Sequence, residues 1–82
     1  METSGYLHTL AVGECATITS LQIGGSMRRR LLDIGFVPGT IVECVGKAPC
    51  GDPIAFCVRG AVIALRVADS RHITVGRDIT WD

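Results

Sequence analysis

Four cysteines are the residues best suited to chemistry in this sequence, because thiolates bind soft metals and exchange disulfides. They stand at positions 15, 44, 50 and 57, and no two of them form the C-x₂-C pair of a structural zinc site. Cys50 in a loop and Cys57 on the outward face of the next strand could approach across a hairpin. With a third ligand they could then hold a divalent transition metal. Cys44 is expected in the core as a small apolar side chain.

Three consecutive arginines, Arg28, Arg29 and Arg30, form a second chemical feature. Guanidinium groups make bidentate contacts with carboxylates, so this run suits an acidic protein surface. The arginines fall in the first turn of an expected helix, where each cation opposes the helix dipole by roughly a few tenths of a kcal/mol. Local stability does not favour them there. Two interpretations are therefore equally supported. The arginines could form a partner-binding surface with Leu32 and Asp33, or they could simply be the solvated face of the helix.

Catalysis has no support in the sequence. His8 and His72 have no carboxylate or cysteine at metal-ligand spacing, and no nucleophile–base pair, carboxylate dyad or phosphate-binding glycine loop is present. We expect a protein that is not an enzyme and needs no cofactor. Eight basic residues balance eight acidic ones, which argues against a nucleic-acid binder, because such proteins depend on a positive surface.

Length and composition predict one small aliphatic domain. The 82 residues are 48% hydrophobic and include few aromatic side chains, which disfavours stacking surfaces for single strands and aromatic grooves for proline-rich peptides. No apolar run approaches the roughly 18–20 residues of a membrane span, and the N-terminus lacks the features of a signal peptide. We therefore expect a cytoplasmic protein with reduced thiols.

The arginines belong to a short helix with clear boundary signals. Ser26 is an expected N-cap, Gly35 an expected C-terminal residue in a positive-φ conformation, and residues 37–40 (VPGT) an expected type II turn. A helix this short is unstable alone in water. Met27, Leu31 and Ile34 form one apolar stripe along the helix, and we expect this stripe to pack against the rest of the chain.

Short strands are expected around this helix, at residues 15–21, 41–47, 54–60, 61–67 and 73–75. Residues 1–6 are expected to form a frayed lead-in, and residues 76–82 a tail. Leu7 and Leu10 are expected in a single helical turn or an irregular segment that covers the core, and residues 68–72 in a polar break that could include one helical turn. The pattern predicts a mainly β fold, a small closed or partly open antiparallel barrel of about five strands with one or two short helices. It would be a single domain over 1–82, with its core at about 7–75.

The segments RRRLLDIGFVPGT, APCGDPIAFCVRG, IALR and HITV, in this order, resemble the FeoA family over about Leu7 to Val75. The most specific matches are Leu31, Gly35, Pro38, Gly39, the Gly51-Asp52-Pro53 turn, Gly60 and Ala64-Leu65-Arg66. The resemblance implies an SH3-like β-barrel, a fold that also ends the iron-dependent repressors related to the diphtheria toxin regulator. The stand-alone form is expected here. Cys50 and Cys57 depart from the family pattern.

The resemblance also implies a function. It would be a non-catalytic accessory protein of ferrous iron uptake that binds and regulates FeoB, the membrane transporter with a cytosolic GTPase domain. The 26–34 helix would supply the contact, and the protein would reach the inner membrane only through this partner. One alternative is a transition-metal-binding or redox module using Cys50 and Cys57. Another is a detached regulatory domain that binds a peptide from a transcription factor.

Overall fold

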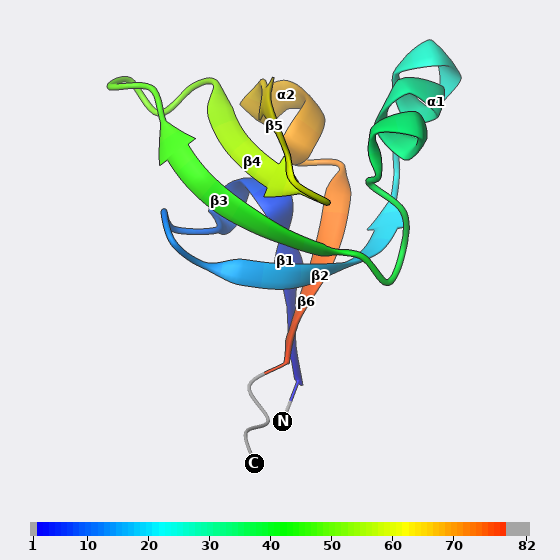
Figure 1. The fold of residues 1–82 in the computed structure, drawn as a ribbon, viewed down its shortest axis with the longest axis horizontal. Coiled ribbons are helices and arrows are strands. Elements are labelled where there is room, and N and C mark those ends of the chain that lie inside the picture. Colours follow the sequence, from blue (N-terminus) through cyan, green and yellow to red (C-terminus); the bar gives the residue numbers. More distant parts are fainter. Residues whose placement is uncertain (1, 79–82) are drawn as a thin grey trace.

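The computed structural model describes residues 2–78, which form one antiparallel sheet accompanied by short helices (Figure 1). Its elements in chain order are β1 (Glu2–Tyr6), the 3-10 turn η1 (Leu7–Thr9), β2 (Cys15–Leu21), α1 (Gly25–Ile34), β3 (Ile41–Lys47), β4 (Ile54–Val58), β5 (Ala61–Leu65), α2 (Val67–Ser70) and β6 (Ile73–Asp78). Within the described residues the six strands follow the spatial order β1-β6-β2-β3-β4-β5. The mainly β fold predicted from the sequence is confirmed, although the sheet has one more strand than expected and is not closed.

The N-terminal lead-in expected over residues 1–6 is wrong, because Glu2–Tyr6 form the edge strand β1. It pairs antiparallel with β6, from Glu2 opposite Asp78 to Tyr6 opposite Thr74. The same pairing extends β6 three residues beyond the expected end of the last strand at Val75. The rest of the expected tail, residues 79–82, lies outside the described residues. The sequence of β1 is polar and shows no alternation of apolar residues, so it gave no signal for a strand. The strand forms through backbone hydrogen bonds to β6, which do not depend on side-chain type.

The hydrophobic core is one cluster of buried side chains, contributed by strands β2 to β6, by η1 and by α1. Alternation along the strands predicts its members correctly: Ala16 and Ile18 in β2, Val42 and Cys44 in β3, and Ile54, Phe56 and Val58 in β4 are all buried. Leu7 and Leu10 are fully buried around η1, as expected of a helical turn that covers the core. α2 supplies the helical turn expected in the polar break before β6.

The end of α1 follows the predicted signals, and its start does not. Gly35 is the C-terminal cap, and its N–H donates to the carbonyl oxygens of Leu31 and Leu32. The N-cap is Gly24 rather than Ser26, which lies exposed inside the helix, and no side chain caps the first turn. Glycine is an accepted N-cap, and here the two glycines of the connection turn the backbone into the helix without a hydroxyl.

Two tight turns connect the strands near α1, one at residues 37–40 and one between β4 and β5. The predicted type II turn is confirmed: the N–H of Thr40 donates to the carbonyl oxygen of Val37 at 3.0 Å, and Gly39 has a φ of +96°. The same turn bonds to Ile18 of β2 through its Gly39 N–H and Thr40 carbonyl. The β4–β5 hairpin turns over two residues, Arg59 and Gly60, which both have positive φ as a type I′ turn requires.

Candidate functional site

Helix α1 docks through the apolar stripe predicted from the sequence. Leu31 is 1% exposed, and Met27, Leu32 and Ile34 are half-buried against the core. The opposite face carries Arg29 and Asp33, which are both exposed. The helix is therefore held by one side and presents the other.

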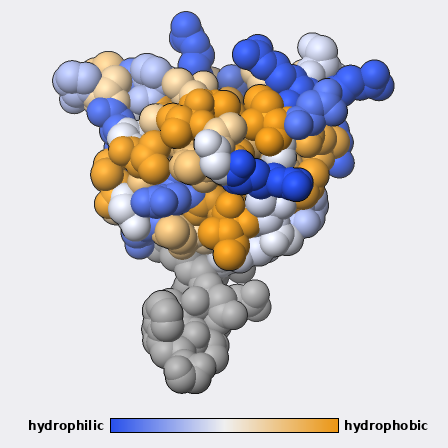
Figure 2. Space-filling model, in the orientation of Figure 1, coloured by the Kyte–Doolittle hydropathy of each residue, from blue (hydrophilic) through white to orange (hydrophobic). Residues whose placement is uncertain are grey.

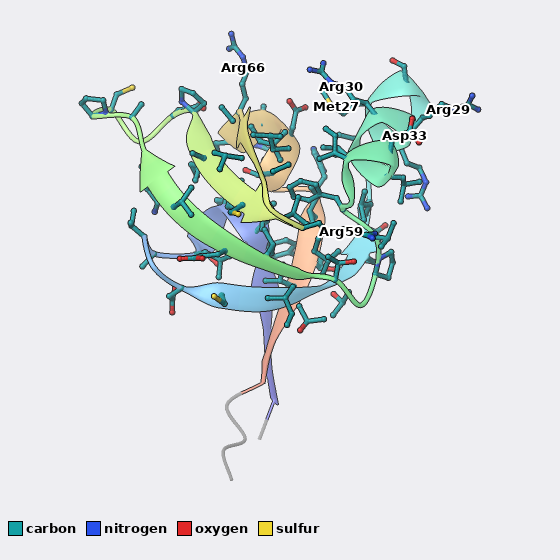
Figure 3. The ribbon with its side chains drawn as sticks, viewed as in Figure 1. Met27, Arg29, Arg30, Asp33, Arg59 and Arg66 are labelled. Atoms are coloured by element: carbon teal, nitrogen blue, oxygen red, sulfur yellow. The ribbon has the colours of Figure 1, made fainter. Side chains whose placement is uncertain are left out.

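The three arginines differ in what they do. The Nη1 of Arg28 donates to the carbonyl oxygen of Leu21 at 2.8 Å, which ties the first turn of α1 to the end of β2. Arg29 and Arg30 are exposed, and their side chains extend away from the helix (Figure 3). Of the predicted partner-binding set, Arg28 therefore has a structural bond, while Arg29 and Arg30 remain available to a partner.

Leu32 and Asp33 lie beside Arg28 and Arg29 around a shallow depression on the outer side of α1. Its volume is about 260 Å³, and its fifth lining residue is Gly25. The structure thus brings four of the five predicted partner-binding residues to one surface. Arg30 faces a different feature.

That feature is a groove of about 400 Å³ between α1 and β5. Its lining comes from α1 on one side and from β5 and α2 on the other: Met27, Arg30, Leu31, Ile34, Ile63, Ala64, Leu65, Arg66 and Asp69. Arg30 and Arg66 extend at the same end of the molecule, with Met27 beside Arg30 (Figure 3). No pattern in the sequence predicted this groove. The available signal was the apolar composition of AVIAL before Arg66.

Basic residues are concentrated in a few segments of a chain that is formally neutral, and two of them, Arg30 and Arg66, line the groove. Six of the eight basic residues lie in α1, in the β4–β5 turn or close after β5, namely Arg28, Arg29, Arg30, Arg59, Arg66 and Arg71. The acidic residues of these segments are Asp33 and Asp69. Figure 2 shows hydrophilic side chains that project at the upper edge of the viewed face, and others that lie among the apolar residues at its centre. A net charge of zero therefore conceals an uneven distribution of basic residues along the chain.

The cysteines lie in separate environments. Cys44 is fully buried, as predicted. Cys50 is exposed in the β3–β4 loop, where its thiol donates to the carbonyl oxygen of Asp52 at 3.1 Å. Cys57 is half-buried inside β4, opposite Glu43 of β3. Since Cys57 stands three residues beyond the start of β4, about 10 Å of strand separates it from the loop that carries Cys50.

Within residues 2–78, no group of three or more His, Cys, Asp or Glu side chains is arranged to hold a metal ion. The geometry therefore gives Cys50 and Cys57 no third ligand between them. Neither of the two α-helices in this part of the chain has the length and apolar character needed to cross a membrane.

Comparison with known proteins decides the family. The FeoA domain model matches residues 6–77, nearly all of the chain. The chain belongs to the FeoA family. It is 36% identical to the FeoA protein from Chlorobium tepidum, whose solution structure matches with a TM-score of 0.81 over 85% of this chain and 67% of that one. The resemblance noted from the sequence motifs is thus confirmed.

Two further FeoA relatives extend this picture. Stenotrophomonas maltophilia FeoA, described as a prokaryotic SH3 domain protein and solved in complex with zinc, is 31% identical with a TM-score of 0.76, over 85% of this chain and 87% of that one. The Fe(2+) transport protein A/Fe(2+) transporter FeoB fusion protein of Porphyromonas gingivalis is 33% identical over 69 residues, which cover 84% of this chain. The chain spans only 8% of that fusion protein's length.

The expected SH3-like fold is also confirmed. A manganese-dependent transcriptional repressor shares it, with a TM-score of 0.78 over 92% of this chain and 42% of the repressor. At 16% identity this likeness concerns the fold alone.

Proposed function

We propose that this FeoA-family chain is a non-catalytic accessory protein of ferrous iron uptake that binds the cytosolic part of FeoB and regulates it. The observation that carries the proposal is the Porphyromonas gingivalis fusion, in which a similar segment and FeoB form one polypeptide. Fusion holds two modules at a high effective concentration. A separate chain must reach the same association through a surface of its own. The protein would then act at the cytoplasmic side of the inner membrane, with the ferrous ion as the transporter's cargo.

The exposed surface of α1 is the proposed contact. Arg29, Leu32 and Asp33 lie on its outer side, and Arg30 lies on the side that faces the groove. Exposed guanidinium groups can pair with carboxylates of the partner. Arg28 borders the same surface, and its bond to Leu21 fixes the first turn of the helix. The C-terminal end is fixed as well, since Phe36, which follows the cap residue Gly35, is fully buried in the core.

Regulation follows from a rigid contact surface. A bound protein shifts a transporter between states only if it binds one state more tightly than the other. A helix fixed at both ends presents its side chains in one arrangement, so a change in the GTPase domain would change how well the two surfaces match. The proposal therefore predicts that affinity depends on the bound guanine nucleotide.

An amide-shift NMR titration of the reduced protein with the soluble GTPase domain of its cognate transporter, with and without guanine nucleotide, tests this proposal. Shifts should cluster on residues 28–33. The double variant Arg29→Glu/Arg30→Glu should weaken binding by about tenfold or more. A matched double variant, Lys47→Glu/Arg71→Glu, makes the same charge change at exposed positions away from α1 and should bind within about twofold of the native chain.

The full-length transporter in detergent provides the second arm. If Arg29→Glu/Arg30→Glu and Lys47→Glu/Arg71→Glu both bind the full transporter as tightly as the native chain does, the contact lies elsewhere on the protein. Absence of binding to both the GTPase domain and the full transporter would reject the proposed partner.

A further inference from the structure

β5 has an open outer edge. It is the last strand of the sheet among the described residues, and its pairing partner on the other side is β4, from Val58 opposite Ala61 to Ile54 opposite Leu65. In an antiparallel ladder, alternate residues direct both backbone N–H and C=O toward the partner strand or away from it. The tight turn places Ala61 toward β4, so the backbone groups of Val62 and Ala64 are directed outward.

The sequence of β5 contains none of the usual protections of an edge strand. Proteins blunt such edges with charged side chains, proline or a bulge, because an open apolar edge recruits other strands. β5 reads AVIAL and pairs with β4 without a bulge. Val62 is 63% exposed, and Ala61 and Ala64 are exposed as well. The strand is therefore open in backbone and apolar in side chains.

This edge faces the groove that α1 bounds on the other side. Ile63, Ala64 and Leu65 line the groove from β5, while Met27 and Ile34 line it from α1. An extended segment laid along β5 would direct alternate side chains toward the apolar wall of α1.

The charges around β5 favour a particular segment. Arg59 immediately precedes the strand's turn glycine, Arg66 immediately follows the strand, and Arg30 lies across the groove from it. Asp69 is the acidic residue in the lining. A second copy of β5 in antiparallel pairing would set Arg59 of one copy near Arg66 of the other at both ends. Like charges in opposed positions destabilise strand pairing, so the arginines disfavour self-association and favour an acidic strand.

We infer that β5 binds an extended segment of a partner protein as an added antiparallel strand. The segment has a short stretch in which apolar side chains alternate with others. One of its ends carries an Asp or Glu that meets Arg66 and Arg30, and the other end carries an Asp or Glu near Arg59. Backbone bonds to Val62 and Ala64 provide the affinity, and the apolar groove and the arginines provide the specificity. This inference does not rest on the proposed transporter partner, because it concerns the groove and the chemistry of its ligand.

The experiment is an NMR titration with the peptide acetyl-DEVTVSLED-amide. Amide shifts should concentrate at residues 62–66 and at Met27, and hydrogen exchange at Val62 and Ala64 should slow about tenfold at saturation. Arg66→Glu should weaken binding about tenfold, whereas its matched control Arg71→Glu, an exposed arginine outside the groove lining, should change it less than about twofold. The basic peptide acetyl-KKVTVSLKK-amide should bind at least about tenfold more weakly.

Two N-methylated forms of the acidic peptide test strand addition without altering the protein. One carries N-methyl groups on the odd positions and the other on the even positions. Only one set of N–H groups can face β5, so one form should lose binding and the other should keep it. Equal binding by both forms would overturn strand addition. No binding by the acidic peptide at about 1 mM would overturn the site. Sedimentation that shows a dimer of the native chain, together with a monomer for Arg66→Glu or slowed hydrogen exchange at Val62 and Ala64 in the dimer, would overturn the acidic partner in favour of a second copy.

Discussion

The side chain of Arg59 lies across Gly35. A Cβ atom placed on Gly35 would stand 2.8 Å from Cδ and 3.3 Å from Cγ of Arg59. Gly35 ends α1, whereas Arg59 begins the β4–β5 turn, so this contact joins the helix to the hairpin that forms the opposite wall of the groove. The φ of Gly35 is +130°, a conformation that L side chains rarely adopt. Glycine is needed here for the backbone and for the space.

Gly35→Ala should lower the free energy of unfolding by about 2 kcal/mol, because it adds a positive-φ strain of about 1–3 kcal/mol and displaces the arginine stem. Urea denaturation measures the change. The same substitution in an Arg59→Ala background separates the two causes, since the steric conflict is absent there. If Gly35→Ala lowers the free energy of unfolding equally in both backgrounds, the contact with Arg59 is not a cause of the destabilisation.

Arg28→Ala should destabilise the protein by about 1 kcal/mol, the typical net value of a hydrogen bond, because Arg28 donates to the carbonyl oxygen of Leu21. Arg29→Ala removes the same side chain one position later on the exposed face and should stay within about 0.5 kcal/mol of the native chain. Thermal unfolding of the two variants in parallel tests this. Equal destabilisation would mean that the bond to Leu21 does not stabilise the native fold.

Asp52→Ala should lower stability by about 1 kcal/mol, the usual cost of a lost helix cap. Its Oδ1 accepts the N–H of Val67 at 3.1 Å, so the β3–β4 loop caps the first turn of α2. Asp52→Asn keeps an acceptor oxygen and should retain most of this stability. Hydrogen exchange at the Val67 amide is the local readout; unchanged protection in Asp52→Ala would contradict the capping role.

The four thiols should react with a maleimide in the order of their exposure. Cys15 and Cys50 are exposed, Cys57 is half-buried and Cys44 is fully buried. Mass spectrometry of the reduced, folded protein should therefore find Cys15 and Cys50 labelled first, Cys57 next, and Cys44 only after unfolding in urea. Labelling of Cys44 at the rate of Cys50 under native conditions would show that the core opens locally.

Local patterns in the sequence determined much of the fold. The bounds of β2 and β3, the burial of Ile54, Phe56 and Val58, and the turn at residues 37–40 follow from signals within a few neighbouring residues. Alternation marks a strand because successive side chains point to opposite faces, and the proline-glycine pair matches the backbone angles of its turn. Family membership also followed from short motifs, and the domain match over residues 6–77 confirmed it.

Tertiary structure alone decided the rest. β1 depends on β6 from the other end of the chain, the cap of α2 comes from Asp52 in a distant loop, and Arg28 finds its acceptor at the end of β2. The groove joins α1 to β5, and neither segment by itself shows a site. These features depend on which backbone groups and side chains meet in space. A pattern confined to one segment carries no information about the second segment, so only the folded chain reveals them.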